Sequence, residues 1–209
     1  MRYIYFSLFS GGTYSNKSSI LQSSAQHNLA YLALFCGLRP GEILALRYEN
    51  YDPNMRTLFI REEYTKEDHL PGMKTPDQSV TYCFRHLNQA EHTPFHLKVP
   101  EFICRQLNER IWQNEQFFHQ HPNRENPKAF CLSARGTIKV LPTLNVQLKQ
   151  IAKENALPSI SMLDLRYMHI YLLMQKGLDY DDIATSMHLS PARIKYLCLL
   201  ILDNIPEEN

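Results

Sequence analysis

The fold of this chain is decided by the stretch GLRPGEILAL, which spans Gly37–Leu46. It places an arginine, Arg39, in a tight glycine and proline turn between two apolar segments that read as helices. Arginine is not a turn former, and its charge has few routes to water from this position. Because burying an unpaired charge costs several kcal/mol, we expect Arg39 to face an anionic partner.

Outward from this turn, the apolar and polar pattern predicts a mainly helical chain with a few strands. Gly37 marks a helix end and Pro40 a helix start. The expected helices span residues 24–36, 40–46, 101–119, 142–155, 161–176, 180–187 and 190–202, and the expected strands span residues 57–64, 79–84 and 93–99. This order predicts a mainly α domain with a small antiparallel β-sheet of three strands, an α+β fold.

Composition bounds the chain without deciding its function. The 209 residues and 44% apolar content allow one proper core, and the net charge of +1 gives little general attraction to nucleic acid. We divide the chain into an irregular lead-in (1–22), a main domain (23–202) and an acidic tail (203–209). The five cysteines form no CxxC pair and predict reduced core residues of a cytoplasmic protein, and no 18-residue apolar span predicts a membrane helix.

Metal and hydrolase chemistry find little support in the sequence. The pairs His92/His96 and His119/His121 have no cysteine or carboxylate set nearby, so we expect neither a metal nor a cofactor. A nucleophile elbow of the Gly-x-Ser-x-Gly type does not occur.

Four further residues complete a constellation with Arg39. Lys74 lies in a turn before the second expected strand, and Arg166 lies inside an otherwise apolar helix. His188 falls in the turn between the last two helices, and Tyr196 lies on the final helix. Taken singly, each has an ordinary structural explanation, such as a solvated lysine or a tyrosine of the core.

Alternatives stay open for two members of the constellation. Arg166 could form a salt bridge with Asp164 or Glu42 in place of binding a ligand. Lys66 is a poorer substitute for Lys74, since its place relative to the expected turn is less suitable.

In order and spacing, these residues resemble the tyrosine recombinases, the phage integrase family. The turn around Arg39 resembles the first arginine box, and Asp164-Leu165-Arg166 resembles the centre of the second. His188 follows Arg166 by 22 residues, as in the family, and Lys74 matches a lysine carried on a β-turn. The resemblance covers residues 24–200 and identifies the main domain as an integrase-like catalytic domain.

The resemblance implies site-specific DNA cleavage and rejoining, as in DNA recombination and integration by a mobile element. The Tyr196 hydroxyl would attack a phosphodiester of double-stranded DNA and form a 3′-phosphotyrosyl bond. Arg39 and Arg166 would bind the phosphate oxygens, because guanidinium forks match phosphate geometry. Lys74 would protonate the leaving oxygen, and His188 would hydrogen-bond the phosphate.

Four departures from the family pattern predict weakened or lost catalysis on a retained fold. Leu163 replaces the histidine that opens the second box, Tyr167 replaces a frequent histidine, and Met187 replaces a glycine before His188. Tyr196 follows His188 by eight residues where the family has nine, a rotation of about 100° on a helix.

Two other hypotheses therefore remain. One is a catalytically inactive integrase-like module that binds DNA or a partner. The other is a helix-turn-helix regulator over residues 182–195. The apolar run 197–202 also suggests that the last helix joins copies of the chain into a homo-oligomer.

Overall fold

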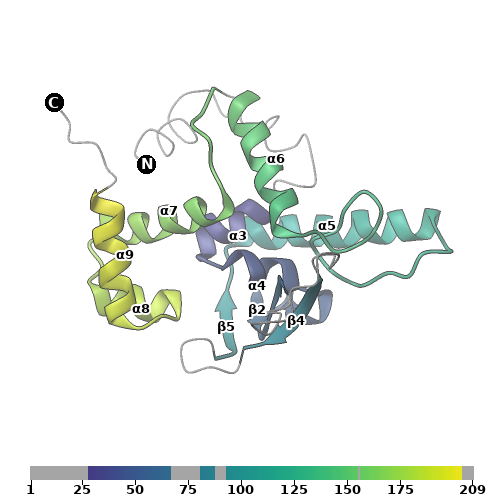
Figure 1. Ribbon diagram of the computed structural model, residues 1–209. Coiled ribbons are helices and arrows are strands. Elements are labelled where there is room, and N and C mark those ends of the chain that lie inside the picture. The colour runs from purple at the N-terminus through teal and green to yellow at the C-terminus, as the bar shows by residue number, and fades with distance from the viewer. Residues whose placement is uncertain (1–27, 67–80, 88–92, 155, 204–209) are drawn as a thin grey trace, which may run out of the picture.

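The computed structural model describes residues 28–66, 81–87, 93–154 and 156–203 (Figure 1). The predicted lead-in and most of the predicted tail lie outside these ranges. In chain order the described elements are α3 Asn28–Cys36, α4 Pro40–Ala45, η1 Tyr48–Asn50, β1 Tyr51–Asp52, β2 Thr57–Ile60, β3 Glu62–Lys66, β4 Tyr82–His86, β5 Phe95–Lys98, α5 Glu101–Gln120, α6 Leu141–Glu154, α7 Met162–Gln175, α8 Tyr180–Met187 and α9 Pro191–Asp203. The predicted mainly α fold with a small antiparallel sheet is confirmed.

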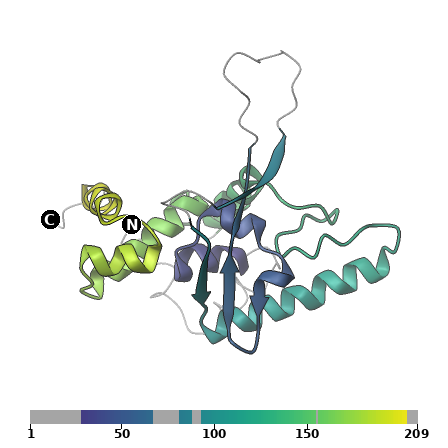
Figure 2. The same ribbon diagram turned by 90° about the horizontal axis from the view of Figure 1, so that it is seen from below.

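The strands form two small sheets, which corrects the single three-stranded sheet expected from the sequence. One sheet has the order β1-β2-β5 and the other pairs β3 with β4, all antiparallel. The strand expected over residues 57–64 breaks at Arg61, between β2 and β3. Leu58 and Ile60 are buried and fix β2 in the core. Strand β3 has no buried residue; it does not continue the first sheet and lies along α4 (Figure 2).

Helix α3 lies at the centre of the main core. Its Leu32 and Ala33 are fully buried, and it packs against both α7 and α5. A second, smaller apolar cluster joins α8 and α9 to the end of α7, at one side of the molecule (Figure 1). Helix α7 serves both clusters, because Leu165 faces the main core and Ile170 faces the smaller one.

Four of the five cysteines are buried and all five are unbridged, in agreement with their predicted place in the core. Cys83 of β4 is the exception, being only partly buried. Over the described residues, the longest helices are too polar or too short for a membrane span.

Candidate active site

The turn that carries Arg39 is built by the end of α3. Gly37 adopts a left-handed φ of +67°, and the amide of Leu38 donates to the carbonyl of Leu32 at 3.2 Å. This closes α3 with the glycine cap that the sequence predicts. Arg39 then follows in extended backbone, and Pro40 opens α4.

Arg39 is fixed at the start of α4 by Glu42. The backbone N–H of Arg39 donates to Oε2 of Glu42 at 2.7 Å, which is the acidic half of a capping box. The guanidinium Nε of Arg39 lies 3.9 Å from Oε1 of the same carboxylate. One acidic side chain therefore both caps the helix and sits beside the arginine.

Arg166 reaches the same turn from α7. Its Nε donates to the carbonyl oxygen of Gly37 at 2.8 Å, across a separation of 129 residues in the chain. The side chain is buried, with 8% of the residue exposed. The fold therefore brings two arginines that are far apart in sequence to one place, with Arg166 bonded to the turn that presents Arg39.

Glu42 carries the negative charge between these arginines. Burial raises the pKa of the Glu42 carboxyl, while the charges of Arg166 and Arg39 oppose that rise. Burial also lowers the pKa of Arg166 to about 10, an effect that Glu42 opposes and Arg39 reinforces. Two guanidinium groups therefore lie near the Glu42 carboxylate, and the charge of Glu63 on β3, which itself pairs with Arg85, raises the pKa of Glu42 further.

The salt bridge from Arg166 to Asp164 that the sequence left open does not form. Oδ2 of Asp164 accepts from the amide and from Oγ of Ser161, both at 2.8 Å, and Asp164 thereby caps α7. Over the described ranges, no carboxylate oxygen lies within 4.0 Å of the Arg166 guanidinium. The acidic neighbour of Arg166 is therefore Glu42, at a longer range.

His169, which the sequence reasoning missed, ties α7 to the same turn. Its Nδ1 lies 2.9 Å from the carbonyl oxygen of Leu34, near the end of α3. Burial lowers the pKa of His169, so the neutral ring is favoured. The only sequence signal was its position three residues after Arg166, which puts both side chains on one face of α7.

His188 ends α8 and carries the left-handed backbone of that turn. It has φ 51° and ψ 49°, and its ring stacks on Phe95 of β5 with 3.7 Å between the centroids. Burial lowers the pKa of this imidazole. Met187, which stands where the family has glycine, is helical, and the positive φ falls one residue later, at His188.

Met187 in fact packs against the arginine turn. A Cβ built on Gly37 would lie 2.6 Å from the Met187 sulfur and 2.8 Å from Cδ2 of His169. Only glycine fits at position 37, for its left-handed φ and for this close approach. The α8 end, the α3 end and α7 therefore meet at one point.

Tyr196 lies on the outer face of α9. It is 55% exposed, while its neighbour Leu197 is 4% exposed and lies within the smaller core cluster. The guanidinium carbon of Arg193 lies 5.3 Å from the centroid of the tyrosine ring. Tyr196 is therefore at most partly buried, whereas Leu197, which follows His188 by the nine residues typical of the family's nucleophile, packs in the core.

Of the other positions that the sequence singled out, some are exposed or partly exposed and one lies outside the described residues. Lys74 lies outside the described residues, and Lys66 is the exposed last residue of β3. Leu163 is 43% exposed, one helical turn before Arg166, and its side chain offers no polar atom. Tyr167 lies next to Arg166 and its hydroxyl interacts electrostatically with that guanidinium.

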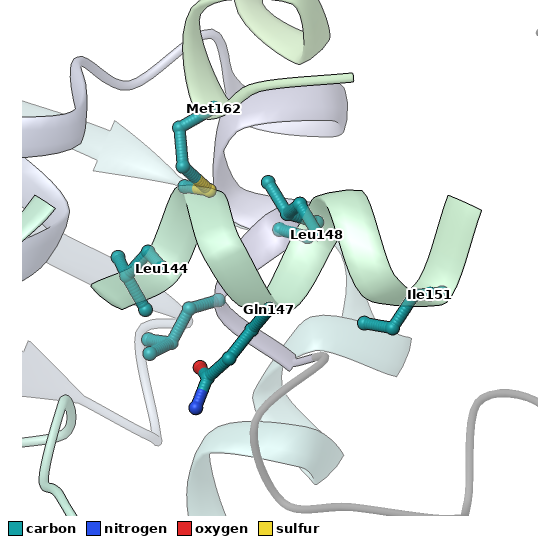
Figure 3. A pocket seen from close by; sticks show the side chains of 7 residues that line it. Leu144, Gln147, Leu148, Ile151 and Met162 are labelled. Carbon is teal, nitrogen blue, oxygen red and sulfur yellow. The ribbon is translucent and has the colours of Figure 1, made fainter. Parts of the chain in front are cut away.

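An apolar hollow between α3, α6 and the start of α7 is a different feature (Figure 3). Among the described residues that line it, Gln147 is the only polar one, and Arg39, Arg166, His188 and Tyr196 are not among them. Its remaining lining residues are Leu29, Ala30, Leu144, Leu148, Ile151 and Met162. Within the described ranges, no three His, Cys, Asp or Glu side chains gather in a way that could hold a metal.

Comparison with solved structures places the fold. The Tn1549 transposon integrase in complex with transposon right end DNA superposes with a TM-score of 0.67 at 12% identity, covering 89% of this chain and 60% of that one. XerA recombinase gives 0.61 at 12% identity, over 91% and 62% of the two chains. XerH site-specific recombinase, bound to its difH substrate before cleavage, gives 0.60 at 15% identity, over 100% and 52%.

The chain therefore has the fold of the tyrosine recombinase catalytic domain, as its sequence motifs predicted. It spans about 60% of the length of the Tn1549 integrase structure. No family model and no curated protein sequence matches it. At these identities the likeness concerns the fold alone, and the chemistry is argued from the residues.

Proposed function

We propose that this chain binds duplex DNA through a backbone phosphate, as a tyrosine recombinase domain whose strand cleavage is weakened or lost. The observation that carries the proposal is the meeting of Arg39 and Arg166 at the α3–α4 turn, with Glu42 as their shared carboxylate. A phosphate would be an anionic ligand for both guanidinium groups. Two guanidinium forks suit its non-bridging oxygens, where charge builds up as a phosphodiester is attacked.

The remaining predicted residues would complete the site around that phosphate. His188 would donate to a phosphate oxygen, with its ring held by Phe95. As the Tyr196 oxygen bonds to phosphorus and its proton passes to solvent, Lys74 would protonate the leaving 5′-oxygen, which gives a 3′-phosphotyrosyl bond and a 5′-hydroxyl. Reversal of these steps would rejoin the strands, which is the chemistry of DNA recombination and integration. No cofactor is part of the proposal.

Two features support impaired cleavage. Position 163 holds a leucine where the second box would supply a phosphate donor, and that side chain is half exposed beside Arg166. Tyr196 sits on the outer face of α9 while Leu197 fills the inner face. Bringing the tyrosine to where Leu197 points would rotate the helix by about 100° and expose its core residues, so cleavage would carry a conformational cost.

A nicked duplex that traps the covalent intermediate tests this proposal. We expect the wild-type chain to bind the duplex and to form little or no adduct, with any adduct lost in Tyr196→Phe. Binding should weaken in Arg39→Gln, whose site lacks one fork. A stoichiometric covalent adduct with wild-type protein would overturn the proposed impairment. Equal duplex affinity of the wild type and of Arg39→Gln would overturn the phosphate site.

The inactive binding module is the second candidate, and the outer face of α9 favours it. Tyr196, Leu199 and Leu202 are all about half exposed there, which suits a second copy of the chain or a partner. We propose a homo-oligomer through this helix, in a cytoplasmic protein. Sedimentation of the wild-type chain and of Leu199→Glu would test it, since an added charge should dissociate such an assembly.

The helix-turn-helix regulator is the least supported alternative. Helices α8 and α9 are joined by a short turn, yet they pack through their apolar faces onto the end of α7. This alternative also leaves Arg39 and Arg166 without a role. Strong preference for one short duplex sequence, kept in Arg39→Gln, would favour the regulator over the phosphate site.

A further inference from the structure

An ion pair of the β3–β4 sheet lies against the turn that carries Arg39. Glu63 of β3 and Arg85 of β4 stand directly opposite each other in this antiparallel pair. The Nε of Arg85 donates to Oε1 of Glu63 at 2.8 Å, and its Nη2 donates to the same oxygen. The other oxygen faces the start of α4, because a Cβ built on Gly41 would lie 3.3 Å from the Glu63 Cβ and 3.6 Å from Oε2. Contact with Gly41, two residues after Arg39, therefore places the pair beside the proposed phosphate site.

Glu63 adds a second carboxylate at a place where the proposed site has to attract an anion. Its side chain is only 19% exposed, and its charge raises the pKa of Glu42 at the same helix start. The carboxylates of Glu42 and Glu63 equal in number the guanidinium groups of Arg39 and Arg166. An uncompensated charge on Glu63 would therefore oppose a bound phosphate, since like charges repel more strongly where water is partly excluded.

Arg85 compensates for the charge of Glu63. Its guanidinium donates two N–H groups to that carboxylate, and its side chain is 51% exposed. Ion pairs with so exposed a partner add little to the stability of a fold, so the larger consequence of this pair is for the electric field at the turn. When Arg85 is counted with the two site arginines, guanidinium groups outnumber the two carboxylates.

We propose that Arg85 and Glu63 together set the DNA affinity of this site, with Glu63 repelling the bound phosphate and Arg85 masking that charge. The proposal rests on the phosphate site proposed above and identifies what tunes its affinity for duplex DNA. Both residues act through space on the ligand of Arg39 and Arg166, and neither takes part in the reaction.

The test is the duplex affinity of four chains: the wild type, Arg85→Gln, Glu63→Gln and the double variant. At low salt we expect Arg85→Gln to bind roughly tenfold more weakly and Glu63→Gln to bind roughly threefold more tightly. The double variant should return to near the wild-type affinity, because it loses one charge of each sign. Higher salt should shrink these differences, since ions screen partly exposed charges. A purely structural pair would not give tighter binding when one partner is lost.

Lys128→Gln is the matched control, since Lys128 also pairs with a glutamate, Glu115, whose side chain is partly exposed. That pair lies beyond the other end of α4, where the Lys128 carbonyl accepts from the amide of Tyr48 at 2.7 Å. Lys128→Gln removes the same charge as Arg85→Gln and should weaken binding by less than about threefold, because its distance from the site allows more screening. Urea-unfolding midpoints of all the variants should stay close to that of the wild type.

The outcomes separate this inference from the proposed function. Tighter binding by Glu63→Gln, together with recovery in the double variant, supports the inference. The inference is overturned by a Glu63→Gln variant that binds no more tightly than the wild type, by a double variant as weak as Arg85→Gln, or by equal losses in Arg85→Gln and Lys128→Gln. Each of these results leaves the proposed phosphate site intact if Arg39→Gln still weakens binding. Equal affinity of the wild type and Arg39→Gln would end the phosphate site itself.

Discussion

The arginine turn and the α9 helix show two ways of holding a functional side chain. At the turn, Arg166 bonds to Gly37 and His169 to Leu34, so side chains at the proposed phosphate site also join α7 to α3. On α9, Tyr196 and Arg193 stand on the outer face, and apolar packing of other residues holds the helix. A substitution at the turn should therefore alter both the proposed phosphate site and the free energy of unfolding. A substitution on the outer face of α9 can alter the proposed site without changing the free energy of unfolding. This difference is consistent with the proposed loss of cleavage on a retained fold.

The largest expected effect is at Glu42. Replacing it with alanine removes the cap of α4 and the carboxylate shared by two arginines, and leaves Arg166 buried without a counter-charge. We expect a loss of about 4 kcal/mol in the free energy of unfolding, measured in urea. Glu42→Gln keeps an acceptor for the cap and should lose less. Glu49→Ala, which breaks the exposed pair with Arg61, is the control and should cost less than about 1 kcal/mol.

Substitutions on the two faces of α9 should differ in their effect on the free energy of unfolding by nearly as much as Glu42→Ala costs. Leu197→Ala opens a cavity in the smaller core cluster and should cost about 3 kcal/mol in urea unfolding. Tyr196→Phe and Leu199→Ala, both on the exposed face, should each change stability by less than about 0.5 kcal/mol. A large loss in Tyr196→Phe would break the comparison, since the tyrosine hydroxyl would then support the fold.

A smaller effect is expected at Gly37. Gly37→Ala adds a methyl group at a positive φ and against the Met187 sulfur, and we expect a loss of about 2 kcal/mol. Gly177→Ala is the matched control, with φ +80° and open space around it, so only the backbone cost of about 1 kcal/mol remains. Combining Gly37→Ala with Met187→Ala should cost less than the sum of the two. Simple additivity would mean that no contact crosses from α8 to the turn.

The smallest effect is a pH dependence from His169. Because its pKa is lowered in the folded chain, the unfolded chain binds the proton first as the pH falls below 6.5, and stability falls with it. One such group changes the free energy by at most about 1.4 kcal/mol per pH unit. His169→Asn, which can still donate to Leu34, should flatten the urea-unfolding midpoint between pH 7 and about 5 relative to the wild type. An unchanged profile would assign the dependence to other groups, among them His188.

Much of the fold could be predicted because its signals are local. Gly37 and Pro40 mark the turn by their backbone needs, and the predicted helix over residues 180–187 coincides with α8. The split of the strands at Arg61 could not be predicted, since it depends on which side chains the core accepts. The alternating pattern predicts that Leu58 and Ile60 lie on one buried face, but it does not predict which strand β3 pairs with.

The candidate site could be predicted only where its residues sit in a motif. Arg39 and Arg166 were found through their unusual apolar surroundings. Glu42 was weighed as a mere salt-bridge partner, because its double contact appears only once α7 and α4 are packed together. His169 was missed, since its contact joins two helices that are far apart in the chain.

The most direct test of the central claim is a crystal structure of the chain bound to a short DNA duplex. We predict that nitrogen atoms of Arg39 and Arg166 lie within about 3.2 Å of oxygens of one and the same phosphate. Tyr196 should remain on the outer face of α9, without a bond to phosphorus. A duplex that rests elsewhere on the surface, with both guanidinium groups away from any phosphate, would contradict the account.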